Sequence, residues 1–143
     1  MSELLEPVFF TDRDLGIRFP DILAAAGFHV ERHKDHFAPD CSDEEWLETI
    51  GTRGWIAVTH DRRIRYKPNE LAAIVRHRVA LLVVIGKVPF PLLAQSFVTT
   101  APRIFDFLAR HRPPFIAKVY RPSPSELTNN PNATGAVTLW YPR

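Results

Sequence analysis

Short apolar runs alternate along this chain with segments in which apolar residues recur every three or four positions. Such runs are typical of buried strands, and the periodic segments are typical of helices that bury one face. Strands are predicted at Val8–Thr11, Phe28–Arg32, Trp55–Thr59, Val79–Ile85 and Phe115–Tyr120. Helices are predicted from Phe19 to Phe28, from Asp43 to about Arg53, from Asn69 past Val75, and from Pro91 onward.

Local residues mark where several of these helices begin. Ser42, followed three positions later by Glu45, has the pattern of a capping box. Asn69 is predicted to cap the next helix. Pro102 should kink or split the longest helix, because proline has no backbone N–H to donate. The residues from His33 to Asp40 carry no periodic pattern and are interpreted as a polar loop.

The alternation of strands and helices predicts an α/β fold. We expect a three-layer α/β/α sandwich with a central, mostly parallel sheet and helices on both faces. In such sheets ligands bind beyond the carboxyl ends of the strands. Asp12 and Asp61 each follow a predicted strand directly, so both are expected at this edge.

The C-terminal segment differs from the rest of the chain. It is rich in Pro, Ser, Asn, Thr and Gly, and it has no apolar pattern until Val137–Tyr141. We therefore predict one domain over residues 1–122 and a tail over residues 123–143. The apolar end of the tail should pack on the domain or on a partner.

Length and composition limit the class of protein. The chain has 143 residues, of which 45% are hydrophobic, enough for a single domain with a real core. Its single cysteine, Cys41, excludes an internal disulfide framework and suits a reducing compartment. No basic-then-apolar leader and no bilayer-spanning run is present. We expect a soluble, cytoplasmic protein that does not enter a membrane.

The charges are divided unevenly along the chain. Residues 1–61 carry 13 Asp and Glu against 5 Lys and Arg, whereas residues 62–143 carry 3 against 13. The net charge is therefore −8 over residues 1–61 and +10 over residues 62–143. Carboxylates bind divalent metal ions, and basic side chains bind phosphate backbones. The split favours a protein that brings metal to a nucleic acid.

Three aspartates are candidate metal ligands. Asp12 and Asp61 follow strands, and Asp43 heads the helix face that carries Trp46 and Leu47. Mg²⁺ and Mn²⁺ take oxygen ligands, and carboxylates from separate segments can hold such an ion against a phosphodiester. Each residue taken alone is explained more simply by a cap or turn than by catalysis, and together they point to one place. Asp14, one step further into its loop, is interpreted as a turn residue.

A basic cluster follows Asp61 directly. It consists of Arg62, Arg63, Arg65 and Lys67, with Tyr66 among them. These side chains could grip phosphates beside a metal, with Tyr66 stacking on a base. A solvated basic loop is the plainer alternative, and Arg13 can be explained equally by a salt bridge to a neighbouring acid.

The order of these features resembles the PIN domain family. In PIN domains an Asp opens a helix, a buried strand follows, and the chain then reads Thr-x-Asp. Here Asp43 opens the helix and Thr59-His60-Asp61 follows the strand, 18 residues on, while Asp12 matches the first PIN acid. The resemblance covers roughly residues 8–120. It is closest to short PIN-like proteins grouped with the VapC-type toxins of type II toxin–antitoxin pairs, which share the Asp-Arg, Asp-Glu-Glu-Trp and Thr-x-Asp-Arg-Arg motifs.

This resemblance implies a metal-dependent endoribonuclease that acts as the toxin of a toxin–antitoxin pair. It implies that Asp12, Asp43 and Asp61 ligate Mg²⁺ or Mn²⁺ and are catalytic, with Glu44 as a weaker candidate. Arg13, Arg62, Arg63 and Arg65 would bind RNA. The implied partners are RNA and an antitoxin, and a homodimer is a further option. Ordinary PIN domains carry one more acid, usually a Glu, before the residue matched by Asp43; spacing does not decide whether Asp35 or Asp40 replaces it.

Other functions remain open from the sequence. The strand ending in Asp12-Arg13-Asp14 also resembles haloacid-dehalogenase-type phosphatases, in which Asp12 would be the nucleophile, Asp14 a general acid and Lys87 the later lysine. No downstream acidic pair completes that pattern. A zinc site at His33, Asp35, His36 and Cys41 lacks a second ligand pair. A module that binds RNA or a partner without catalysis is the remaining alternative.

Overall fold

A six-stranded sheet forms the centre of the molecule in the computed structural model, which describes residues 6–142. Its order is β2-β1-β3-β4-β5-β6. The strands are β1 (Val8–Thr11), β2 (His29–Arg32), β3 (Ile56–Thr59), β4 (Ala80–Ile85), β5 (Phe115–Tyr120) and β6 (Val137–Tyr141). The first five are parallel and β6 runs antiparallel to β5. The predicted mostly parallel α/β fold is therefore confirmed.

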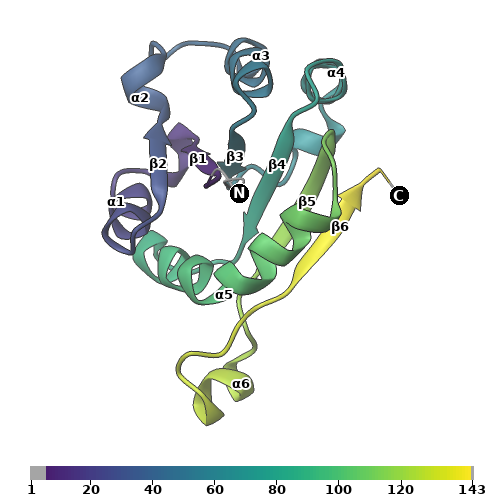
Figure 1. The fold of residues 1–143 in the computed structure, drawn as a ribbon. Coiled ribbons are helices and arrows are strands. Elements are labelled where there is room, and N and C mark those ends of the chain that lie inside the picture. The colour runs from purple at the N-terminus through teal and green to yellow at the C-terminus, as the bar shows by residue number, and fades with distance from the viewer. Residues whose placement is uncertain (1–5, 143) are drawn as a thin grey trace.

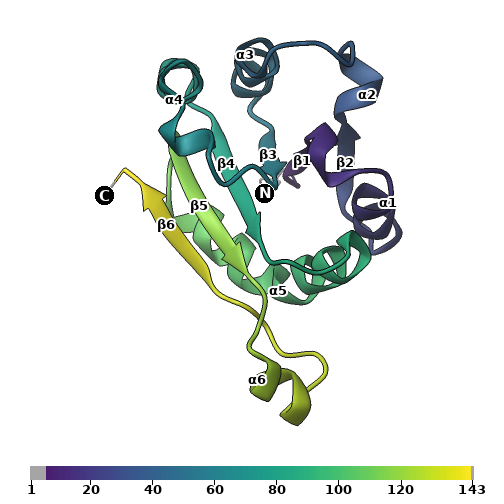
Figure 2. The ribbon, with the colours of Figure 1, turned by 180° about the vertical axis from the view of Figure 1, so that it is seen from behind.

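Helices cover both faces of this sheet and complete the three layers (Figures 1 and 2). On one face lie α1 (Arg18–Ala25) and α5 (Phe90–Arg110), and on the other lie α3 (Asp43–Arg53) and α4 (Pro68–Arg76). Four short elements connect them: η1 (Arg13–Leu15), α2 (His33–His36), η2 (Ile64–Tyr66) and α6 (Pro124–Asn129). None of the described helices is long and apolar enough to cross a membrane.

A hydrophobic core lies on each face of the sheet, between the strands and the helices that cover that face. Because successive strand residues point to opposite faces, Phe9 packs with α1 and α5 whereas Phe10 packs with α3 and α4. Leu81 and Leu82 of β4 divide in the same way. The continuous apolar runs in the sequence therefore reflect strands that are buried on both sides.

The helix boundaries show which local signals hold. The Ser42 hydroxyl accepts a hydrogen bond from the Glu45 N–H (3.2 Å), as expected for the start of α3. Asn69 does not cap α4, and that prediction was wrong. The helix begins one residue earlier at Pro68, whose fixed φ and missing N–H suit the first helical position. Proline at position 102 does not split α5, which is continuous through it.

Two segments predicted to be irregular contain regular structure. The expected polar loop after β2 begins with one helical turn, α2. In the segment from residue 123 onward, Ser123 and Glu126 form a reciprocal capping box that starts α6, and Val137–Tyr141 extends the sheet as β6. Gly135 permits this return, because a Cβ there would lie only 1.6 Å from the Tyr120 carbonyl oxygen.

Candidate active site

Four aspartates from three chain segments line one open cavity of about 400 Å³ at the carboxyl edge of the sheet. Asp12 follows β1, Asp14 lies in η1, Asp43 is the first residue of α3, and Asp61 follows β3. The segments meet because β1 and β3 are parallel neighbours, and α3 runs back across the sheet so that it begins at the same edge. We call this space the aspartate cavity.

Thr59 connects two of these carboxylates. Its hydroxyl oxygen lies 2.9 Å from Asp12 Oδ2 and 3.0 Å from Asp14 Oδ2, and its single hydrogen can be donated to only one of them at a time. The same oxygen accepts the Asp61 N–H at 3.2 Å. A buried threonine at the end of β3 therefore fixes the relative positions of three acidic residues.

The protein disfavours negative charge on the first two acids. Burial, and then the charge of Asp14, raise the pKa of Asp12 to about 7, although bonds from Thr59 and from the Arg13 N–H oppose the rise. Burial also raises the pKa of Asp14, against hydrogen bonds from the His60 N–H and from Thr59. Two carboxylates are thus held together without enough positive charge to compensate them.

Lys67 supplies a cation beside the other two acids of the cavity, Asp43 and Asp61. Its Nζ lies 2.7 Å from Asp61 Oδ2 and 4.0 Å from Asp43 Oδ2. The hydrogen bond to Asp61 raises the pKa of Lys67. Asp43 is also held by Trp46, whose indole Nε1 donates to Oδ1 at 2.9 Å. An ammonium group therefore bridges two acids that come from different segments.

The donor set of the aspartate cavity fits a hard divalent cation. Carboxylate oxygens are the ligands that Mg²⁺ and Mn²⁺ prefer, and the raised pKa of Asp12 indicates that a cation there would be stabilised. Among residues 6–142, no three Asp, Glu, His or Cys side chains are close enough to hold an ion as they stand. The ammonium of Lys67 gives a physical reason, because it already bonds Asp61 and would have to move away.

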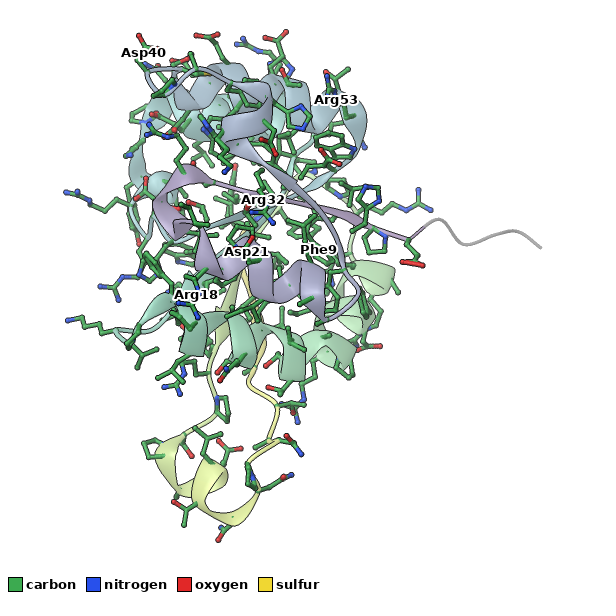
Figure 3. All side chains as sticks on the ribbon, turned by 90° about the vertical axis from the view of Figure 1, so that its left-hand side faces the viewer. Phe9, Arg18, Asp21, Arg32, Asp40 and Arg53 are labelled. Carbon is green, nitrogen blue, oxygen red and sulfur yellow. The ribbon has the colours of Figure 1, made fainter. Side chains whose placement is uncertain are left out.

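The structure sorts the acids proposed from the sequence. Asp12, Asp43 and Asp61 line the aspartate cavity, whereas Glu44 lines a separate hollow between α3 and α4. Asp35 and Asp40 are exposed and do not line the cavity; Figure 3 shows Asp40 at an outer end of the molecule. The fourth acid that lines the aspartate cavity is Asp14. The repeated Asp of Asp12-Arg13-Asp14 was its sequence signal, but the 3₁₀ turn that brings it back beside Asp12 was not foreseen.

The predicted RNA-binding arginines also divide. Arg13 and Arg63 line the aspartate cavity, and Arg62 is exposed on the same turn. Arg65 points elsewhere, with its guanidinium carbon 5.3 Å from the Tyr66 ring centre and 5.6 Å from that of Trp140. Arg65 thus packs against β6 and does not line the aspartate cavity, and its predicted RNA contact stays a prediction.

The histidines after β2 do not gather around one point. His36 bonds Glu31, with 2.7 Å between Nε2 and Oε1. His33 is buried against the rings of Phe10 and Phe37. Burial and the nearby charge of Arg13 lower the pKa of His33. The two imidazoles therefore have different partners, and no group of zinc ligands forms in the described part of this segment.

One comparison with known proteins gives a match. The sequence model of a family described as a PIN-like domain matches residues 7–86, which is more than half of the chain. The matched range contains Asp12, Asp14, Asp43 and Asp61 and ends just after β4. Neither the curated proteins nor the solved structures contain a significant match.

Proposed function

Because this chain belongs to the PIN-like domain family, whose members are generally nucleases, we propose that it is a metal-dependent endoribonuclease. One observation carries the proposal: four aspartates from three separate segments converge on one open cavity. A cavity at the carboxyl edge of a parallel sheet is the usual place for a ligand in such folds. Phosphodiester hydrolysis is the chemistry that clustered carboxylates and adjacent arginines best support.

Each residue has a defined role in this proposal. Asp12, Asp14, Asp43 and Asp61 would hold Mg²⁺ or Mn²⁺. The metal would activate a water and neutralise charge on the phosphate. Thr59 keeps Asp12 and Asp14 in register, and Trp46 orients Asp43. Arg13 and Arg63, which line the cavity, would hold the phosphate, and the exposed Arg62 on the same turn would bind the strand outside it.

The substrate and the biological role rest on the sequence resemblance. The short PIN-like toxins that share the Thr-x-Asp-Arg-Arg turn make RNA the substrate that we propose. The same resemblance supports a toxin role with an antitoxin as partner, and a homodimer is a further proposal. The excess of Lys and Arg in residues 62–143 supports binding to a polyanion.

Cleavage of a mixed RNA pool tests the proposal directly. Wild-type protein with Mg²⁺ or Mn²⁺ is expected to cut the pool, and EDTA is expected to stop it. Asp61→Asn should remove most of the activity, because the neutral amide is a weaker ligand for a divalent metal ion than the carboxylate. Gel analysis of end-labelled RNA measures the result.

A matched variant makes this experiment specific. Glu44→Gln removes a carboxylate one residue after Asp43, but its side chain lines the other hollow, so cleavage should stay near the wild-type rate. If wild type, Asp61→Asn and the EDTA sample all leave the RNA intact, the catalytic proposal is wrong.

Replacing Lys67 with methionine is expected to strengthen Mn²⁺ binding severalfold. The substitution removes the ammonium that bonds Asp61 and approaches Asp43, while the aliphatic length of the side chain is kept. Isothermal titration of the metal into both proteins measures the change. Weaker metal binding in Lys67→Met would mean that the lysine orders the acids and does not compete with the ion.

A non-catalytic binding module is the second candidate. The observation that favours it is the Lys67–Asp61 ion pair, because a cavity stabilised by its own lysine does not require a metal. Such a protein would bind RNA equally with and without metal and would not cleave it. The phosphatase alternative has no comparable support, since Lys87 does not line the cavity.

A further inference from the structure

A second hollow lies beside the aspartate cavity, with Asp12, Arg13 and His33 shared between their linings. Its volume is about 220 Å³. The remaining lining comes from the end of β1, from the turn before α1, and from the start of α2: Thr11, Gly16, Ile17, Pro20, Arg32 and Lys34. We call this space the basic hollow.

Positive charge dominates its lining. Arg13, Arg32 and Lys34 contribute three cations, and Asp12 is the one acid. Arg32 is oriented by Asp21 of α1, with 2.6 Å between Nη1 and Oδ1, and Figure 3 shows the two side chains facing each other between β2 and α1. Under the proposed function, a metal ion in the aspartate cavity would compensate the charge of Asp12.

His33 carries a buried polar atom that lacks a partner. The residue is 3% exposed, and its Nδ1 makes no hydrogen bond within residues 6–142. Buried polar groups nearly always have a partner, so an unpaired nitrogen in a residue that lines a hollow indicates a missing ligand there. The neighbouring rings of Phe10 and Phe37 cannot supply this hydrogen-bond partner, because they carry no polar atom.

The start of α1 gives an independent indication. Gly16, Ile17 and Pro20 bring this helix end to the basic hollow. Ile17 occupies the N-cap position and provides no side-chain hydrogen bond, so the N–H groups of Arg18 and Phe19 have no side-chain cap, while Pro20 has no N–H. Free N–H groups and the helix dipole attract anions, and phosphate is the anion most often bound in this way.

We propose that the basic hollow binds a second phosphate group of the substrate strand, next to the phosphodiester held in the aspartate cavity. Three cations and the uncapped start of α1 provide donors for phosphate oxygens, and the unpaired Nδ1 of His33 is a further polar atom in the wall of the hollow that no described side chain satisfies. The shared wall of Asp12, Arg13 and His33 places this phosphate directly beside the acids. That the strand is RNA rests on the proposed function, whereas the binding of a phosphate group in the basic hollow is argued independently of it.

Metal-free binding tests this site separately from catalysis. Single-stranded RNA with a fluorescent 3′ end, carrying either a 5′-phosphate or a 5′-hydroxyl, is titrated with protein in EDTA. Lys34→Ala and Arg32→Gln are compared with Arg76→Ala, which removes an exposed cation at the end of α4. Lys34→Ala is expected to weaken binding about five- to tenfold at about 0.1 M salt and to reduce the salt slope by about 0.7. Arg76→Ala should match wild type.

Each outcome decides the matter. Weaker binding of only the 5′-phosphorylated RNA assigns the basic hollow to a terminal phosphate, and equal weakening of both RNAs assigns it to an internal phosphodiester. Binding by Lys34→Ala that equals Arg76→Ala overturns the proposal, as does a wild-type protein that binds neither RNA. Thermal melting of Arg32→Gln checks its fold, because it loses the Asp21 ion pair. A failure to cleave RNA with metal would leave this result unchanged, so the two proposals fail separately.

Discussion

Replacing Asp12 with asparagine is expected to lower metal-dependent RNA cleavage at least about a hundredfold. Loss of a charged metal ligand removes about 3 kcal/mol of transition-state stabilisation, which corresponds to that factor. The single oxygen of asparagine can still accept the hydrogen bond from the Arg13 N–H, and its amide NH₂ can donate to the Thr59 hydroxyl oxygen, so the local geometry should persist. Single-turnover cleavage at saturating Mg²⁺ measures the effect.

The stability of the same variant provides the control. The pKa of Asp12 is about 7 in the folded protein against an ordinary 3.8, so between these values the folded state binds more protons than the unfolded chain. The free energy of unfolding of metal-free wild type should therefore fall as the pH rises from about 4 to 7. Asp12→Asn has no carboxylate to ionise at this buried position. At pH 8 its free energy of unfolding should therefore exceed that of wild type, by an amount on the order of 1 kcal/mol. A clearly less stable variant would assign the lost cleavage to damage of the fold.

Replacing Trp46 with alanine is expected to lower the free energy of unfolding by about 3–5 kcal/mol. Trp46 is fully buried and packs against Phe10, with 5.4 Å between the ring centres, so truncation leaves a large cavity under α3. That loss is a large share of the 5–15 kcal/mol typical of whole domains. Equilibrium denaturation in urea measures the change.

Trp46→Phe separates packing from positioning. Phenylalanine fills most of the space but cannot donate the bond that the indole Nε1 gives to Asp43 Oδ1. It should cost much less stability than alanine and still reduce cleavage, because Asp43 loses the partner that orients it. Unchanged cleavage in a folded Trp46→Phe protein would show that Asp43 needs no such support.

The sequence located most of the fold because the signals involved are local. The five parallel strands were predicted within about a residue of their observed bounds, since runs such as Val79–Ile85 are apolar on both faces. The start of α4 was missed because Asn69 and Pro68 offer competing signals, and proline at the first helical position prevailed. The pairing of β6 was not foreseen because its partner β5 is distant in the chain and an intervening segment without periodicity hid the return.

The candidate site was predicted in part for the same reason. Position after a strand, or at the head of a buried helix face, is readable from the sequence, and it placed Asp12, Asp43 and Asp61 near one edge. The direction of a side chain on a turn is not readable in this way. Asp14 was therefore undervalued, and Lys67 was predicted to contact phosphates or solvent and not to pair with Asp61.

By itself, the sequence determined the order of strands and helices and the strand-end positions of the principal acids, because hydrophobic period and capping residues act over a few neighbours. Only the tertiary structure decided which polar side chains meet. The pairing of β1 with β3 brought Thr59 between Asp12 and Asp14, and the packing of α3 beside α4 turned Glu44 away from the aspartate cavity. The contacts of Thr59 join residues more than forty positions apart, as in the 47-residue separation of Thr59 and Asp12, and no local pattern encodes such distances.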